Sequence, residues 1–402
     1  MLLPESEGSI TRHIEHAALA RLSAAGLLAY CSYTICRTPL LPLFARDLGA
    51  DAPLVGLVVG ASTLTGIVLK LPAGAWSDIV GRRPLLLGGA VMFAATPFAY
   101  LGVSTLGALI ALRFVHGSAT AVFGPVASAS LSDVAPAGRR ATWLSTYSTA
   151  QGVGQAAGPV LAGYLIVAGR YDLAFVAAGV IALAVPFIVA GRLSPPDLTR
   201  SRAGWEEFVR GIVAVSRDRL ILVTSCAQAA QFALNGTLNA FLPLYGREVL
   251  GLTVTHVGWL FGLQTLTIVA VRPMMGILSD RAGRRGVIVA GLTVCSSAVL
   301  LVSLATGFWT LVAASVAYAG GVATTTAATS AYITDIARRA RYGTAHGVFG
   351  TIYDVGDAFG PIAAGVLVAA VGYTAMFRFM ASGAVVMAVA FAVLSRPRRQ
   401  IR

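Results

Sequence analysis

The chain has 402 residues, of which 56% are hydrophobic and only 12% are charged, and its mean hydropathy is +0.77. Soluble domains carry about 25% charged residues, so this composition excludes a water-soluble globular protein and indicates an integral membrane protein. The net charge of +13 would also suit a nucleic-acid-binding protein, but the positions of the basic residues exclude that class.

Apolar runs long enough to cross a bilayer follow one another along the chain. In chain order they predict twelve transmembrane helices, at about 20–45, 53–73, 84–104, 106–128, 141–168, 172–191, 219–246, 255–275, 286–305, 308–331, 342–370 and 373–395. The expected fold is therefore all-α, with six-helix bundles over 1–192 and 219–402. Between them lies a polar linker, 193–218, in which apolar residues from Trp205 to Val213 recur at helical spacing and predict an amphipathic helix on the membrane surface.

The basic residues are distributed unevenly about these spans. Of the 30 lysines and arginines, 22 fall in the termini and loops on one side, and three fall in loops on the other. By the positive-inside rule, both termini are predicted to be cytoplasmic, in the inner (plasma) membrane. The N-terminal segment does not resemble a cleavable signal peptide, and the four cysteines lie inside predicted spans, where neither a metal site nor another cofactor site is expected.

Several short motifs occur twice at one spacing. The pattern G-x-x-x-G-P-x-x-A-G begins at Gly154 and at Gly356, and 356 − 154 = 202. GAWSDIVGRR at 74–83 matches GILSDRAGRR at 276–285, and Lys70 corresponds to Arg272, both at the same offset. The chain is therefore predicted to be a duplicated six-helix unit, which is typical of secondary transporters.

These residues resemble the major facilitator superfamily over essentially the whole chain. Residues 74–83 are similar to its motif A, Arg113-Phe-Val-His116-Gly117 to motif B with His116 in place of the usual Gln, and 154–163 to motif C with Ala162 in place of a usual Gly. Motif C is typical of the drug:proton antiporter branch. The resemblance implies twelve spans in two pseudo-symmetric bundles that transport by alternating access.

The motifs suggest two contacts between the bundles. Glycines one turn apart allow close helix approach and Pro kinks a helix, so an inter-bundle seam is predicted at Gly154, Gly158, Pro159, Gly356, Gly360 and Pro361; plain helix packing is the alternative. By resemblance, motif A supplies a cytoplasmic gate, Asp78 facing the eleventh span and Asp280 the fifth, with Arg82, Arg83, Arg284 and Arg285 beside them. The arginines would also hold the loops inside. Asp133 and Asp335 are interpreted as helix caps, with a gate contact as the alternative.

Ionisable residues inside spans are candidate functional sites, because their burial in a membrane is costly. Asp354 and Asp357 are the two acidic residues deep in a span, and their spacing places them on one helix face. The predicted proton-coupling residues are Asp354, Asp357, Arg113, Arg37 and His346. The alternative is a structural role, with an aspartate paired to an arginine or bonded to Asn235 or Asn239. Lys70 and Arg272 are interpreted as snorkelling or gate-supporting residues at helix ends.

Polar residues in other spans either line a cavity or hold helices together. As substrate-cavity candidates we predict Tyr30, Tyr33, Gln228, Gln231, Asn235 and Gln264. The expected function is proton-coupled efflux of small amphipathic molecules, by a monomer that contacts substrate, protons and lipid. Symport or exchange of a sugar or other metabolite is the alternative, and a membrane receptor or enzyme is a remote one, because the chain has no P-loop or Gly-x-Ser-x-Gly motif.

Overall fold

The computed structural model describes residues 5–136, 138–166, 170–191, 217–337 and 342–395, without the side chains of 5–15, 71, 72, 74, 75, 78, 79 and 342–344. Its helices are α1 (Glu5–Arg37), α2 (Leu40–Asp47), α3 (Ala52–Ile79), α4 (Arg82–Ala99), the short η1 (Tyr100–Gly102), α5 (Leu106–Val134), α6 (Arg140–Leu165), α7 (Asp172–Ala190), α9 (Arg219–Glu248), α10 (Val254–Ala282), α11 (Arg284–Val302), α12 (Phe308–Ile336) and α13 (Tyr342–Leu394). The predicted surface helix at 205–213 lies outside the described residues.

Twelve spans are present in the part of the chain that the structure describes. Nine segments there are long and apolar enough to cross a membrane. Two further spans, α6 and α9, carry more polar residues and are absent from those nine; the twelfth arises because α13 contains two helices joined at Gly372, whose φ is 77°. The predicted all-α, twelve-helix fold is confirmed.

Local sequence explains where the helices begin. Asp51 accepts a hydrogen bond from the Leu54 amide at the start of α3, and Thr253 accepts one from His256 at the start of α10. These two caps are equivalent in the duplication, since 253 − 51 = 202. The motif A turns also match: Gly81 and Gly283 have φ values of 100° and 87°, which favour glycine.

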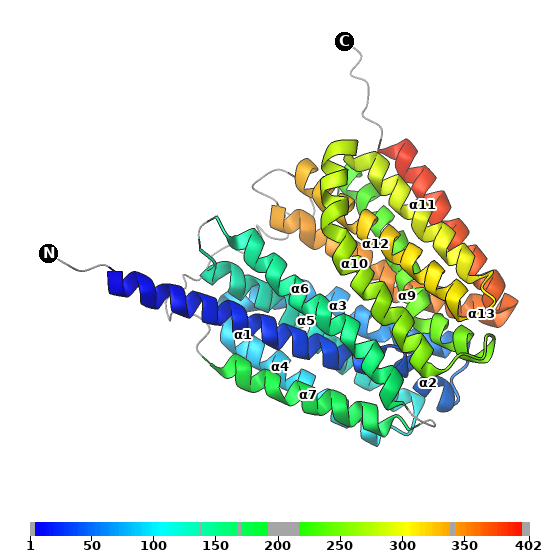
Figure 1. Ribbon diagram of the computed structural model, residues 1–402, viewed down its shortest axis with the longest axis horizontal. Coiled ribbons are helices and arrows are strands. Elements are labelled where there is room, and N and C mark those ends of the chain that lie inside the picture. Colours follow the sequence, from blue (N-terminus) through cyan, green and yellow to red (C-terminus); the bar gives the residue numbers. More distant parts are fainter. Residues whose placement is uncertain (1–4, 137, 167–169, 192–216, 338–341, 396–402) are drawn as a thin grey trace, which may run out of the picture.

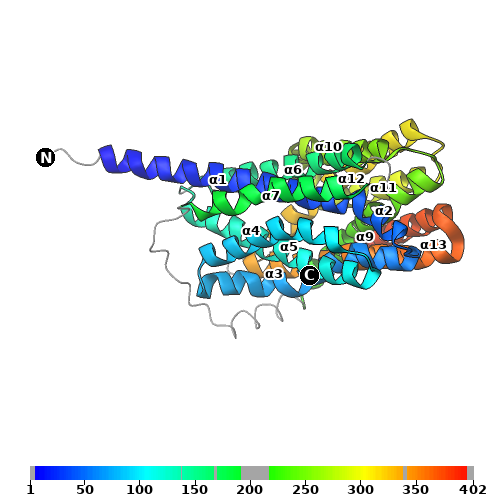
Figure 2. The same cartoon turned by 90° about the horizontal axis from the view of Figure 1, so that it is seen from below.

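The helices form two bundles, α1–α7 and α9–α13 (Figure 1). The bundles meet near α2 and the α9–α10 connection, and they diverge toward the end where α1 begins and α13 finishes (Figure 1). We call these the closed end and the open end. The bundles touch mainly where α3 packs against α13 and α6 packs against α10; α3 and α13 approach each other in Figure 2.

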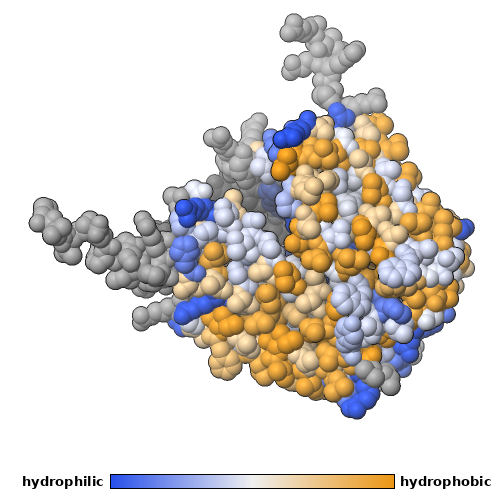
Figure 3. Space-filling view, in the orientation of Figure 1, coloured by the Kyte–Doolittle hydropathy of each residue, from blue (hydrophilic) through white to orange (hydrophobic). Residues whose placement is uncertain are grey.

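The outer surface suits a lipid environment. Large apolar side chains such as Phe187, Trp309 and Val386 are 79%, 78% and 68% exposed. Apolar residues spread over the flanks of both bundles in the view of Figure 3, whereas the most hydrophilic residues gather toward the ends. Exposed apolar surface of this extent on long helices is expected of a protein embedded in a bilayer.

Candidate functional site: the interface between the bundles

The repeated Gly-Pro motifs pack mostly inside their own bundles. A Cβ on Gly154 would lie 2.2 Å from the Leu27 carbonyl oxygen of α1, and one on Gly356 would lie 2.0 Å from the Ala229 carbonyl oxygen of α9. Gly158 likewise approaches α1, against Cys31, Thr34 and Ile35, and Gly360 approaches Ala233 of α9. The predicted inter-bundle seam is therefore wrong for these four glycines, because they face the first helix of the same bundle.

The seam is instead formed by the motif prolines and by glycines that face them. A Cβ on Gly56 of α3 would lie 2.2 Å from the Pro361 carbonyl oxygen, and one on Gly258 of α10 would lie 2.4 Å from that of Pro159. Since 258 − 56 = 202 and 361 − 159 = 202, the two contacts are copies of one another. Glycine here allows backbones of opposite bundles to touch, as close helix packing in membranes requires.

Charged and tyrosine side chains add a second layer of contacts at the closed end. Arg46 of α2 donates to Glu248 of α9 across the interface at 3.1 Å, and the Tyr373 hydroxyl donates to the same carboxylate at 2.8 Å. The Tyr171 hydroxyl donates to Asp47 at 2.5 Å. Burial and this carboxylate raise the pKa of Tyr171, so its hydroxyl stays a donor.

Asp357 of α13 lies where four helices of the two bundles meet. Its carboxylate accepts hydrogen bonds from Arg37 at 3.1 Å, from Thr63 at 3.0 Å and from Asn235 at 3.1 Å. Arg37 ends α1 and Thr63 belongs to α3, whereas Asn235 lies on α9. The structure thus joins three predicted site residues, and the pairing with Arg37 and Asn235 matches the structural alternative considered for the sequence.

Asp354 has a different partner, which sequence reasoning missed. The Lys70 ammonium lies 2.5 Å from its carboxylate, and the Asp354 side chain is only 6% exposed. Lys70 is on α3 and Asp354 on α13, so this ion pair also crosses the interface. The interpretation of Lys70 as a snorkelling residue at a helix end is therefore wrong, whereas its alternative role in supporting a gate stays a prediction. The signal available in the sequence was that Lys70 is the one lysine in the chain and lies near the end of a predicted span.

Arg113 is completely buried in the N-terminal bundle, and it forms no ion pair with either aspartate in the described structure. Its guanidinium donates to the hydroxyls of Ser62 and Tyr100, the latter at 3.4 Å, and lies 5.8 Å from the centre of the Tyr33 ring. His116 contacts the same Tyr100 hydroxyl at 3.2 Å. The partners of Arg113 are hydroxyls and aromatic rings, so the site holds a buried positive charge.

The glutamine stripe of α9 holds helices together. Gln228 donates to Gln231 at 2.8 Å and accepts from Thr329 of α12 at 2.5 Å, and Gln231 donates to Tyr318 of α12 at 3.3 Å. Both glutamines are at most 1% exposed, so their prediction as cavity-lining residues is wrong. Their spacing also fits a buried network between two helices of one bundle.

The other cavity candidates lie closer to the interface. Tyr30 and Asn235 are partly exposed, whereas Tyr33 is 6% exposed and bonds to Ser62 at 3.2 Å. Gln264 on α10 is also 6% exposed, and its amide nitrogen is buried without a hydrogen-bond partner in the described structure. Asn235 is the one of these that touches an aspartate of the site.

The predicted gate residues at the open end pair within their own bundles. Arg82 donates to Asp133 at 3.0 Å and Arg284 donates to Asp335 at 2.9 Å, so those aspartates are partners of motif A and the capping interpretation is wrong. Asp280 lies 2.5 Å from Arg284. Arg83 and Arg285 bond to the carbonyls of the last helix of each bundle, at Ala190 and Ala392.

With the open end apart, the predicted contact of Asp280 with α6 is not made among the described residues, and the gate remains a prediction. The side chain of Asp78 lies outside the described part of the structure. His346 contacts Thr334 of α12 at 3.0 Å, and among the described residues it makes no hydrogen bond to Asp354.

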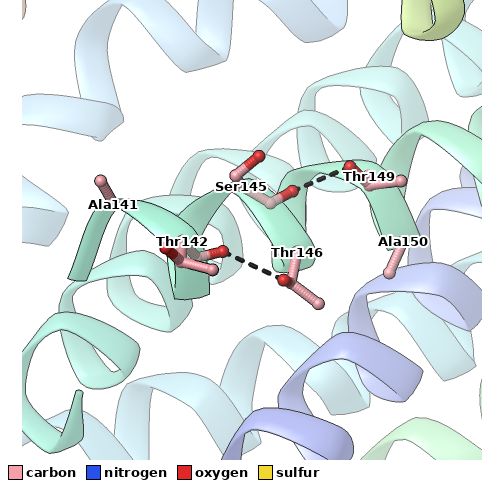
Figure 4. Close-up of a pocket in the computed structure, with 6 residues that line it drawn as sticks. All are labelled: Ala141, Thr142, Ser145, Thr146, Thr149 and Ala150. Atoms are coloured by element: carbon pink, nitrogen blue, oxygen red, sulfur yellow. Dashed lines mark hydrogen bonds between the residues drawn. The ribbon is translucent and has the colours of Figure 1, made fainter. Parts of the chain in front are cut away.

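The open end also contains a recess that sequence reasoning missed. It has a volume of about 700 Å³ and follows one face of α6 (Figure 4), lined by Ala141, Thr142, Ser145, Thr146, Thr149 and Ala150. Thr146 and Thr149 donate to carbonyls of the previous turn, which satisfies their hydroxyls inside the helix. The signal available in the sequence was the recurrence of serine and threonine residues at helical spacing in this segment.

Two six-helix bundles that touch at one end and carry ion pairs at their interface are typical of membrane transporters. The family model of the Major Facilitator Superfamily matches residues 22–256 and 224–402, so the chain belongs to this family, whose members are transporters and not enzymes.

Individual relatives agree with this assignment. An uncharacterized MFS-type transporter of Methanocaldococcus jannaschii is 25% identical over 87% of this chain and 91% of its own length. The quinolone resistance protein NorA of Staphylococcus aureus is 24% identical over 82% of this chain and 84% of its own. A crystal structure of a bacterial homolog of the human lysosomal transporter Spinster, inward-facing and unoccupied, superposes with a TM-score of 0.76 at 18% identity, covering 95% of this chain and 96% of that one.

Proposed function

We propose that this protein exports small amphipathic molecules from the cell in exchange for protons. The closed end would face outward and the open end the cytoplasm of a cell bounded by an inner (plasma) membrane, because most arginines outside the spans lie at the open-end side. Both termini would then be cytoplasmic. The similarity to NorA and the motif at 154–163 favour export over uptake.

The observation that carries the proton coupling is that both buried aspartates pair with cations of the opposite bundle. The Arg37–Asp357 and Lys70–Asp354 pairs join α1 and α3 to α13. Separation of α3 from α13 at the closed end would pull both pairs apart. A buried carboxylate without its cation partner binds a proton more readily.

This arrangement gives an exchange cycle. With the closed end shut, each aspartate is ionised and paired, and substrate enters from the open end. Opening toward the outside would break the pairs, admit protons to the aspartates and release substrate. When the bundles return, the cations would displace those protons toward the cytoplasm. The downhill movement of protons would thereby be linked to uphill export.

The test is transport in sealed vesicles with an imposed pH gradient. We compare the intact chain with Asp354→Asn and Asp357→Asn, using a panel of amphipathic dyes and sugars. At least one variant is expected to keep substrate exchange without a gradient but to lose gradient-driven accumulation, since asparagine cannot carry the proton. Asp172→Asn is the matched control, because Asp172 is exposed at the start of α7 and pairs with Arg170 inside one bundle.

Unchanged accumulation by both variants would show that the aspartates only join the bundles. Accumulation of a sugar with protons moving in the same direction would replace export by symport.

A further inference from the structure

The charges inside the described spans are unequal. Five basic residues, Arg37, Lys70, Arg113, Arg272 and Arg378, accompany two deeply placed acids, Asp354 and Asp357. The acids neutralise Arg37 and Lys70, and Arg113 is sealed from solvent inside one bundle. Arg272 of α10 differs from these three, because it is exposed and has no carboxylate within ion-pair distance in the described structure. Arg378 is also exposed, but it donates to Ser303 at 3.5 Å.

Arg272 lies beside the interface, just beyond its last close contact. Three residues earlier, a Val269 methyl lies 2.7 Å from where a Cβ on Gly152 of α6 would be. Residues three apart share a helix face, so Arg272 lies about one turn further toward the open end on the face turned to α6. The Tyr353 hydroxyl of α13 is within electrostatic range of both Arg272 and Lys70, which places the two cations around one central region.

The duplication shows what is missing there. Arg272 corresponds to Lys70, since 272 − 70 = 202, and the position that corresponds to Asp354 is Gly152, since 354 − 202 = 152. On one side of the pseudo-symmetric interface the cation therefore faces a carboxylate. On the other side the residue that corresponds to this carboxylate is Gly152, which has neither a charge nor a side chain. An anionic ligand beside Arg272 would supply the missing charge.

Aromatic rings border the same region. Tyr353 stacks on Phe232 of α9 with ring centres 4.5 Å apart, and Tyr30 of α1 lies within electrostatic range of Lys70 and Tyr353. The local charge from Lys70, Asp354 and Arg272 is positive by one unit. Such surroundings suit a ligand with one negative charge and a flat apolar body.

We propose that Arg272 binds the carboxylate of an amphipathic organic anion, with the apolar part of that molecule against Tyr353 and Tyr30. The guanidinium fork matches a carboxylate in two-point contact. This inference rests on the proposed export function and names its substrate class: organic acids rather than cations.

The test measures binding at equilibrium, without any ion gradient. The full chain in nanodiscs of zwitterionic phosphatidylcholine is titrated calorimetrically with 2-naphthoate, with its neutral amide and with a naphthyl ammonium of similar size. The acid is expected to bind more tightly than both analogues. Arg272→Gln should weaken naphthoate binding about tenfold or more, and Arg272→Lys should restore part of it.

Arg378→Gln is the matched control, because Arg378 is also an exposed arginine in a span of the same bundle but contacts Ser303. It should leave naphthoate affinity unchanged. Thermal unfolding of each variant checks that Arg272→Gln still folds, and Arg272→Lys provides a second variant if it does not.

Three results would overturn the proposal. The amide or the ammonium could bind as tightly as the acid, or a folded Arg272→Gln variant could stay within twofold of the intact chain. In the third result, Arg272 would be a lipid site. Naphthoate would then fail to bind in phosphatidylcholine nanodiscs, and phosphatidylglycerol would stabilise the intact chain but not Arg272→Gln. Naphthoate binding without proton-driven transport would refute only the export function, and proton-driven transport of cations without naphthoate binding would refute only this site.

Discussion

The close contact between Gly258 and Pro159 predicts how a substitution at Gly258 would change the equilibrium between the conformations in which one end or the other is open. A methyl group at Gly258 would lie 2.4 Å from the Pro159 carbonyl oxygen of the other bundle, and real Cβ atoms do not approach that closely. Overpacking of this kind costs about 1–3 kcal/mol. Because the contact exists only while the closed end is shut, Gly258→Ala should shift the conformational equilibrium toward opening by about 5–150-fold.

The matched control is Gly154→Ala. Its methyl would lie 2.2 Å from the Leu27 carbonyl oxygen, an equally severe overlap, but Leu27 belongs to the same bundle. That contact is expected to persist as the bundles move as units. Gly154→Ala should therefore lower the free energy of unfolding without changing the balance between the two conformations.

The assay follows the accessibility of a reporter cysteine at position 38. Thr38 is 3% exposed and contacts Asn239 of the other bundle at 3.3 Å, so opening of the closed end should uncover it. With the four native cysteines replaced, a membrane-impermeant maleimide added outside intact cells should label Thr38→Cys faster in the Gly258→Ala background.

Equal acceleration by Gly154→Ala, or none by Gly258→Ala, would refute the assignment of these contacts. Reaction only in inverted vesicles would refute the outward orientation of the closed end.

Three further predictions concern the polar contacts. Lys70→Met should destabilise the fold by up to about 3–5 kcal/mol by leaving Asp354 unpaired, and adding Asp354→Asn should recover most of this in thermal unfolding; a double variant no more stable than the single one would contradict the pairing. Glu248→Gln should change stability by at most about 1 kcal/mol, because its ion pair is partly exposed, yet it should speed labelling of the reporter at position 38; unchanged labelling would exclude a closing role. Gln228→Leu should cost about 1–3 kcal/mol by leaving the buried side-chain oxygen of Gln231 without its donor while transport affinity is retained, and a selective loss of affinity would return Gln228 to the substrate site.

The sequence by itself determined the class of the protein. Runs of apolar residues specify spans because a bilayer leaves no water for backbone groups, and helices satisfy those groups internally. The 202-residue offset established the two related bundles, and the two copies of the motif glycines, Gly81 and Gly283, adopt the positive φ that the turn requires. These properties depend on local chemistry and on comparison of the chain with itself.

Only the tertiary structure decided which helices pack against the faces that carry these charged, small and polar residues. Helical spacing placed Asp354 and Asp357 on one face, but the partners Lys70 and Arg37 lie 284 and 320 positions away, on another bundle. The same spacing could not tell that Gly154 faces α1 or that Gln228 faces α12. The rotation of each helix about its axis is fixed by packing against neighbours distant in sequence, and periodicity carries no information about those neighbours.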